Sequence, residues 1–312
     1  MPLFIMNIRT AWSDYFPSNP NFNLNSQTYY SRQTHSSTAV HISNCLFTSF
    51  TSSGHGGALY STSTYLLVES TSFFSCKTSS GHGGAIYFSN GQCVLYGICG
   101  YDCCTTSNSH NGHFAYISVY NSVSSKNYVN YSSISRCVNV NAWYKLYLCY
   151  GNVRCPSVNM SMNKCGGRPF CCIPSTSSNS ITCSLIYSSF TDNNAAQHTC
   201  IYLWQYSGDI FEIKSCSIIR NTQGSLGSQG TIATNGNLYI NDSCILENNS
   251  TYTFYQGNSN CRVFISNCTV DSISCNLNFI ILSTATKSFI LALNHISSLN
   301  YHSKLPQLPF LY

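Results

Sequence analysis

The chain has 312 residues, and only 7% of them are charged, against about 25% in typical soluble proteins. Its net charge of +5 comes from scattered lysines and arginines rather than a basic stripe, so we expect no nucleic-acid partner. The apolar opening is too short for a secretion signal, and no run reaches the roughly 18 apolar residues of a membrane span. Composition therefore leaves the compartment open.

The two ends of the chain differ from its middle. Residues 1–35 lack the repeat that follows and contain Trp12 and Pro20. We expect an irregular cap there, because the open end of a strand stack exposes unpaired edges. Residues 299–312 are expected to form an irregular tail, which leaves residues 36–298 as a single repeat domain.

A nine-residue motif returns in the first third of the chain. The run SSGHGGALY at 52–60 reappears as SSGHGGAIY at 79–87, and a degenerate copy, HNGHFA, occupies 110–115. Internal periods of roughly 20 to 50 residues are typical of repeat architectures.

The same period continues where the glycines stop. The runs FTDN at 190–193, IIRN at 218–221 and LENN at 246–249 lie 28 residues apart. Within a coil, as in 230–247, three short segments alternate apolar and polar residues between turn formers, which indicates strands. Stacked coils would pair each strand in parallel with its equivalents above and below. The sequence predicts an all-β, right-handed parallel β-helix of about nine three-strand coils of ~28 residues.

These motifs carry a family resemblance. The GGAL and GGAI runs at 56–59 and 83–86, with FTDN at 190–193, resemble the repeats of polymorphic outer membrane proteins, which belong to the pectin-lyase-like superfamily. The resemblance implies a β-helix displayed at cell surfaces, often for adhesion. A cell-surface or extracellular location follows from the resemblance alone.

The duplicated Gly-His-Gly is the sharpest candidate for chemistry, because polygalacturonase-like glycosidases of that superfamily carry it beside paired aspartates. Glycoside hydrolysis needs two carboxylates around one bond. The nine acidic residues of this chain form no such cluster. We therefore interpret the motif as a repeated turn in which Gly adopts positive φ, and predict no catalytic residue. Its residues are Gly54, His55, Gly56, Gly57, Gly81, His82, Gly83 and Gly84.

The 19 cysteines follow the same period. Five pairs are 28 residues apart: 76/104, 137/165, 155/183, 172/200 and 216/244. Zinc-type Cys-x-x-Cys spacing is absent, so we predict neither a metal nor a cofactor. Stacked cysteines are most simply small apolar residues of the interior, although disulfides remain an alternative in an oxidising compartment.

Two polar columns are also predicted from the 28-residue step. Lys164, Asp192 and Arg220 should stack as an exposed ion ladder. A column of stacked amides should line an interior turn and hydrogen-bond along the axis. Its members are Asn193, Asn221 and Asn249.

The sequence identifies no activity, and two functions stay open. The first is a non-enzymatic scaffold that presents an adhesion or interaction surface to a protein or glycan. The second is a diverged carbohydrate-active β-helix, a lyase or glycoside hydrolase, with a polysaccharide stacked on Tyr60, Tyr87 and neighbouring residues.

Overall fold

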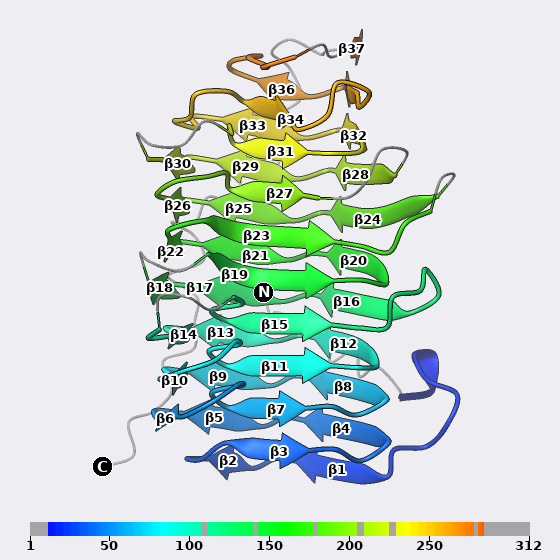
Figure 1. Cartoon of the computed structure of the whole chain (residues 1–312), viewed down its shortest axis with the longest axis vertical. Helices are drawn as coiled ribbons and strands as arrows, with labels where there is room; N and C mark the ends of the chain where they lie inside the picture. Colours follow the sequence, from blue (N-terminus) through cyan, green and yellow to red (C-terminus); the bar gives the residue numbers. More distant parts are fainter. Residues whose placement is uncertain are drawn as a thin grey trace, which may run out of the picture.

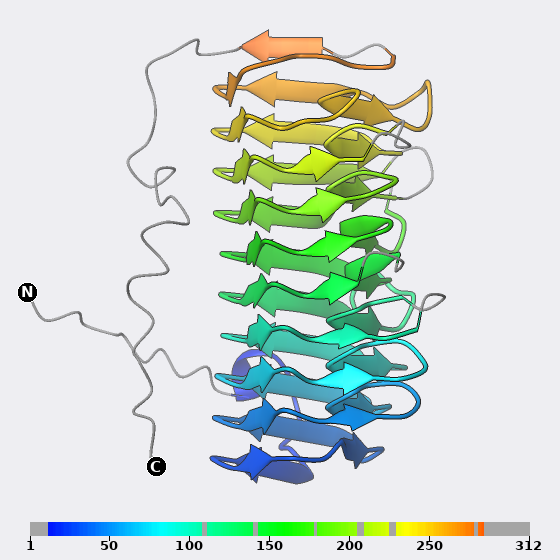
Figure 2. The ribbon, with the colours of Figure 1, turned by 90° about the vertical axis from the view of Figure 1, so that its left-hand side faces the viewer.

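The strands of successive coils stack in parallel into three long sheets and a row of short corner strands (Figure 1). The computed structural model describes residues 12–107, 111–139, 143–177, 180–204, 209–224, 229–277 and 280–283. In Figure 2 each coil forms a flat layer of the stack. Within these residues helix is limited to the 3-10 turn η1 (Trp12–Asp14), so none has the length or apolarity to cross a bilayer.

We name the three long sheets A, B and C in chain order. Sheet A contains β1 (Phe22–Asn25), β4 (Ala39–Ser43), β8 (Tyr65–Glu69), β12 (Gln92–Tyr96), β16 (Lys126–Asn130), β20 (Asn152–Pro156), β24 (Ile181–Ile186), β28 (Ile210–Lys214), β32 (Asn237–Asn241), β35 (Val263–Ser266) and β37 (Ile280–Ser283). Sheet B contains β2 (Thr28–Tyr29), β5 (Leu46–Thr48), β9 (Ser72–Phe74), β13 (Cys99–Tyr101), β17 (Ser133–Ser135), β21 (Asn159–Ser161), β25 (Ser189–Thr191), β29 (Ser217–Ile219), β33 (Cys244–Leu246) and β36 (Thr269–Val270).

Sheet C follows sheet B in each coil, after a two-residue corner strand in most of them. Sheet C contains β3 (Gln33–His35), β7 (Leu59–Ser61), β11 (Ile86–Ser89), β15 (Ala115–Ser118), β19 (Tyr144–Cys149), β23 (Arg168–Ile173), β27 (Ile201–Leu203), β31 (Ile232–Thr234) and β34 (Phe254–Gln256). The corner strands are β6 (Thr51–Ser52), β10 (Lys77–Thr78), β14 (Cys104–Thr105), β18 (Val138–Asn139), β22 (Lys164–Cys165), β26 (Asn194–Ala195) and β30 (Thr222–Gln223).

The winding is that of a right-handed parallel β-helix. With sheet C in front, its strands run left to right while the chain rises, and the chain returns behind through sheets A and B (Figure 1). The nine strands of sheet C are separated by eight steps, which makes about eight turns of roughly 27 residues. The fold class is as predicted, with slightly fewer and shorter turns than the nine coils of ~28 residues expected.

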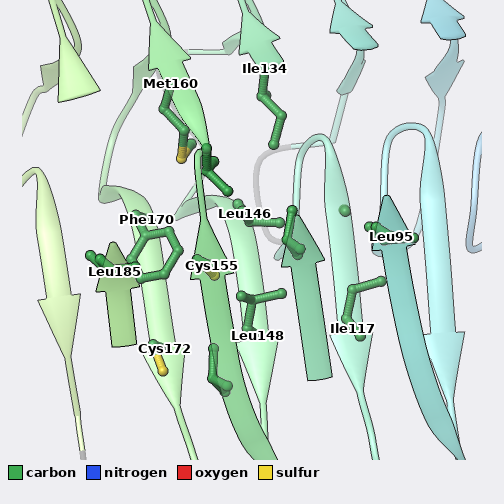
Figure 3. Close-up of a cluster of buried hydrophobic side chains, with 14 of the residues drawn as sticks. Leu95, Ile117, Ile134, Leu146, Leu148, Cys155, Met160, Phe170, Cys172 and Leu185 are labelled. Atoms are coloured by element: carbon green, nitrogen blue, oxygen red, sulfur yellow. The ribbon is translucent and has the colours of Figure 1, made fainter. Parts of the chain in front are cut away.

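The interior is a continuous apolar column fed by all three sheets. In Figure 3, Leu95 and Leu185 from sheet A, Met160 from sheet B and Phe170 and Leu148 from sheet C converge on the axis. In strands such as β28 and β32, buried residues alternate with more exposed ones, because successive side chains point to opposite faces. Burying this inner face against neighbouring coils is what makes a three-strand coil stable.

Two-residue corners fix the path from sheet A through sheet B to the corner strands. The first residue of each corner has positive φ, as in Asn44 (54°) and Ser49 (57°), and its N–H donates to the next coil, here to the carbonyls of Glu69 and Phe74. The second residue then finds a side-chain acceptor in the next coil, as when the N–H of Cys45 bonds to Oγ1 of Thr71 at 3.3 Å. Both corner amides are thus satisfied at a position where the regular ladder turns.

At the second corner the side-chain acceptors are stacked asparagines. The amide nitrogen Nδ2 of Asn193 donates to Oδ1 of Asn221 at 3.0 Å, and Asn163 bonds to Asn193 in the same way. The predicted column of stacked amides therefore exists, but the prediction of Asn249 as its last member was wrong. Asn221 donates to Asn248, also at 3.0 Å, while Asn249 is exposed, because the last step of the column is 27 residues rather than 28.

The 28-residue step also misplaces the other predicted columns. Cys244 pairs with Ser217 rather than with Cys216, although both cysteines lie on neighbouring coils. Lys164 pairs with Asn194, so it does not join the ion pair of Asp192 and Arg220. What the cysteines share is burial. Of the nineteen, seventeen are buried, and only Cys99 is exposed.

The N-terminal segment corrects the predicted cap. Residues 22–35, expected to be irregular, form β1, β2 and β3, the first coil of the solenoid. Trp12 and Phe16 pack on the outer face of sheet A, against Ala39, Leu67 and Val94, rather than over the end of the stack. Residues 1–11, His110 of the degenerate motif and the predicted tail lie outside the described residues.

Candidate interaction face

The Gly-His-Gly motifs form stacked turns that lead from the corner strands into sheet C. Gly56 and Gly83 have φ of 66° and 73°, and a Cβ on either would lie 2.2 Å from a backbone carbonyl oxygen, so only glycine fits. The imidazole rings of His55 and His82 stack with their centroids 5.2 Å apart, and the backbone N–H of His82 donates to Nδ1 of His55 at 2.9 Å. Both histidines are thus built into the turn.

The remaining glycines of the motif follow the same logic. Gly54 and Gly81 also have positive φ, 82° and 99°. Gly57 and Gly84 are needed for close approach, since a Cβ on Gly57 would lie 1.8 Å from the carbonyl oxygen of Gly84. Positive φ is thus found at four of the six glycines, and Gly57 and Gly84 are required for steric reasons instead.

The turns deliver a column of tyrosines onto the outer face of sheet C. Tyr60, Tyr87, Tyr116 and Tyr147 occupy equivalent positions on β7, β11, β15 and β19. Their ring centroids are 5.3, 5.2 and 5.0 Å apart with interplanar angles of 3°, 8° and 20°. Burial raises the pKa of Tyr116 to about 12, so its hydroxyl is neutral at physiological pH.

Small residues interrupt the column above Tyr147 and make room for an arginine. The next positions are Cys171, Tyr202, Ala233 and Tyr255. Cys171 and Ala233 are buried beneath their aromatic neighbours. These two short side chains leave space that longer residues from adjacent positions fill.

Arg168, at the start of β23, occupies this part of the face. Its guanidinium carbon lies 3.8 Å from the ring centroid of Tyr202 and 5.6 Å from that of Tyr144. Its Nη1 donates to the hydroxyl of Tyr144 at 3.1 Å, and its Nη2 donates to Oε1 of Gln229 at 3.2 Å. The side chain is only 7% exposed, and its Nε is buried with no hydrogen-bond acceptor.

Two exposed tryptophans lie beside the tyrosines that contact this arginine. Trp143 and Trp204 are 42% and 40% exposed. The ring centroid of Trp143 lies 5.2 Å from that of His198, and the centroid of Trp204 lies 5.2 Å from that of Tyr202. We call the whole set the aromatic face. It comprises Tyr60, Tyr87, Tyr116, Trp143, Tyr144, Tyr147, Arg168, His198, Tyr202, Trp204 and Tyr255.

The aromatic face contains no acid, because none of the nine Asp and Glu residues lies on a strand of sheet C. Carboxylates with ion-pair partners are found elsewhere. Glu69 contacts His41 on sheet A at 2.9 Å, and Asp192 contacts Arg220 at a corner of sheet B at 2.8 Å. In the described part of the chain no group of three or more His, Cys, Asp or Glu could hold a metal ion.

No family model, curated protein or solved structure matches this chain. The face is therefore interpreted from its own residues. Sequence reasoning named Tyr60 and Tyr87 but missed Trp143, Arg168 and Trp204. These three stand at different points of their coils and share no motif, so only the strand register brings them together.

Proposed function

We propose that this chain is a non-enzymatic β-helix scaffold whose aromatic face binds a protein partner. The observation that carries the proposal is the grouping of Tyr144, Arg168 and Tyr202 on sheet C with Trp143 and Trp204 at the adjoining strand ends. Tryptophan, tyrosine and arginine are the residues most enriched at the energetic centres of protein interfaces. A rigid sheet also presents them at little entropic cost.

The stacking of the tyrosines favours a protein over a polysaccharide. A sugar ring stacks on an aromatic side chain through a free ring face. The faces of Tyr87 are covered by Tyr60 and His55 and by Tyr116, at 5.3, 4.6 and 5.2 Å, so the column presents ring edges and hydroxyls instead. Sheet C also lacks the pair of carboxylates on which glycoside hydrolysis depends.

The motif resemblance supports the same function. Polymorphic outer membrane protein repeats imply a β-helix that acts at a cell surface, often in adhesion. We propose that this chain works in the same way, as a binding surface of a cell-surface or extracellular protein. The pectin-lyase-like relationship belongs to this proposal and adds no activity to it.

Site-specific photo-crosslinking tests the proposal. The photoreactive residue p-benzoylphenylalanine replaces Trp204 in one version of the full chain and Tyr187, a 65% exposed residue at a corner between sheets A and B, in the control. We expect a discrete adduct from position 204 and none from position 187. The captured protein is then purified and its affinity measured by interferometry.

The affinity measurement decides the outcome. We expect Trp143→Ala and Trp204→Ala each to weaken binding at least 10-fold, as for residues at the centre of an interface, and Tyr187→Asn to leave it unchanged. Equal adducts from both positions, or a purified protein that binds both tryptophan variants as tightly as the parent, would contradict the proposal.

A further inference from the structure

We infer that the aromatic face recognises a carboxylate of an acidic peptide segment, and that Arg168 receives it. This inference rests on the proposed function and names the chemistry of the partner. Its starting point is a buried positive charge that no acid of the described chain compensates. An ion held out of water is costly unless it is paired, and the aromatic rings and neutral oxygens around Arg168 pair it only in part.

On one edge of the Arg168 guanidinium only one of the two donors has a hydrogen-bond acceptor. The Nε and Nη2 donors of an arginine point in parallel along one edge, which matches the two oxygens of a carboxylate. Here Nη2 bonds to the single amide oxygen of Gln229 at 3.2 Å, while Nε has no acceptor. A carboxylate that displaced Gln229 would fill both positions and supply the missing charge.

The surroundings favour such an exchange. Tyr202 and Tyr144 hold the guanidinium between their rings, so the edge is oriented before a ligand arrives. Burial excludes water, which strengthens a charge-assisted pair. The sequence places no Asp or Glu between Asp102 and Asp192. Of the acids that follow, Asp192 pairs with Arg220, and Asp209 accepts from the backbone N–H of Ser177.

The carboxylate is assigned to a peptide because of the neighbouring rings. Trp143 and Trp204 provide exposed apolar area beside Tyr144 and Tyr202, the two tyrosines that contact Arg168, as a protein interface requires around a buried ion pair. The tyrosine column beyond them has its ring faces occupied by one another, which leaves an acidic polysaccharide little to stack on.

The two tryptophans also report on the site. The third tryptophan, Trp12, packs on sheet A and is replaced by phenylalanine, so that the tryptophan emission, excited selectively over tyrosine, comes from Trp143 and Trp204 alone. The probe is a short capped peptide of alternating glycine and glutamate, titrated into the full chain. The matched glycine–glutamine peptide, polygalacturonate and heparin are titrated in parallel.

We expect a saturable emission change with the glutamate peptide and none with the glutamine peptide. Arg168→Lys keeps the charge but loses the parallel donors, so it should weaken binding at least 10-fold. Gln229→Ala removes the competing amide and leaves Arg168 in place, so it should bind equally or more tightly. Lys214→Gln, on sheet A, should change nothing.

Several results would overturn the inference. They are equal response to both peptides, response to the polysaccharides in place of the glutamate peptide, absence of saturation at millimolar peptide, or loss of binding in Gln229→Ala with its far-UV circular dichroism intact. If a photo-captured partner depends on the tryptophans but not on Arg168, this inference fails while the proposed function stands. If it depends on neither, both fail.

Discussion

Replacing Asn193 by alanine should remove a large part of the stability of the solenoid. Its buried side chain makes four hydrogen bonds: Oδ1 accepts from the backbone N–H and from Nδ2 of Asn163, and Nδ2 donates to the carbonyl of Met160 and to Oδ1 of Asn221. At roughly 1 kcal/mol net for each bond, the loss is about 4 kcal/mol. That is a sizeable fraction of the roughly 5–15 kcal/mol by which domains are stable.

Asn249→Ala is the matched control, because a strict 28-residue step would put Asn249 in the same column, whereas the structure leaves it exposed. Its cost should stay within about 0.5 kcal/mol. Urea unfolding followed by circular dichroism measures both variants, and hydrogen exchange of the Asn163 amide reports the local loss. Equal costs for the two variants, or a cost below about 1 kcal/mol for Asn193→Ala, would refute the argument.

Three further predictions concern the turns, the thiols and pH. Gly56→Ala should lower the free energy of unfolding by more than about 1 kcal/mol in the same urea assay, because its Cβ would meet a backbone carbonyl. Gly97→Ala, also at positive φ but with no neighbour nearer than 3.6 Å, should lower it by only about 1 kcal/mol. Equal costs would contradict this reasoning. Iodoacetamide should alkylate Cys99 first in the folded chain and all 19 cysteines after denaturation, as read by intact mass; rapid multiple labelling of the folded chain would show that the thiols are accessible. Burial lowers the pKa of His35 and of His198 below the ordinary value of 6.5, so these histidines stabilise the fold while they are neutral, above pH 6.5. That stability should be lost as the pH falls through their lower folded pKa. The melting temperature should therefore drop on acidification, and it should drop less in a variant with both histidines replaced by glutamine.

The fold could be predicted because two local signals agree along the chain. Alternation of apolar and polar residues gives strands, and the recurrence of SSGHGGA at 52–58 and 79–85 gives a coil length near the true one. Neither signal gives the exact number of residues in each coil. From sheet A to the corner strand each coil keeps a constant length, as in Ala39–Ser52 and Tyr65–Thr78, with fourteen residues in both. All variation falls on the way through sheet C.

That variation explains why the columns were misaligned. Strand β16 pairs with β12 in register, with Asn127 opposite Cys93, although the seven-residue connection 119–125 lengthens the coil between them. The next coil, which ends where Asn152 pairs with Lys126, has a connection of only two residues at 150–151. A period of 28 is an average over such coils, so it is right for Asn193 and Asn221 and wrong by one residue for the next step. The alternation along a strand could be predicted, but the residue that each side chain meets on the next coil could not.

The candidate face was the least predictable part, for a related reason. Tyr60 and Tyr87 belong to the repeated motif, so the period finds them. Arg168 and Trp204 belong to no repeat, and only the pairing of β23 with β27 brings their side chains to the same tyrosine. A cation without an acid within the stretch 103–191 was visible in the sequence, but its burial was not.

The same architecture accounts for the position of the candidate face. The corners between sheets A and B and after sheet B are two residues long and carry the hydrogen bonds that join the coils, so changes there break the ladder. Connections on both sides of sheet C range from two residues at 166–167 to nine at 106–114, and loop length costs little free energy. Sheet C and its loops are therefore where side chains can change without loss of the stack. The candidate face, with Trp143, Arg168 and Trp204 at such positions, fits the general pattern in which function lies on the variable rim of a rigid scaffold.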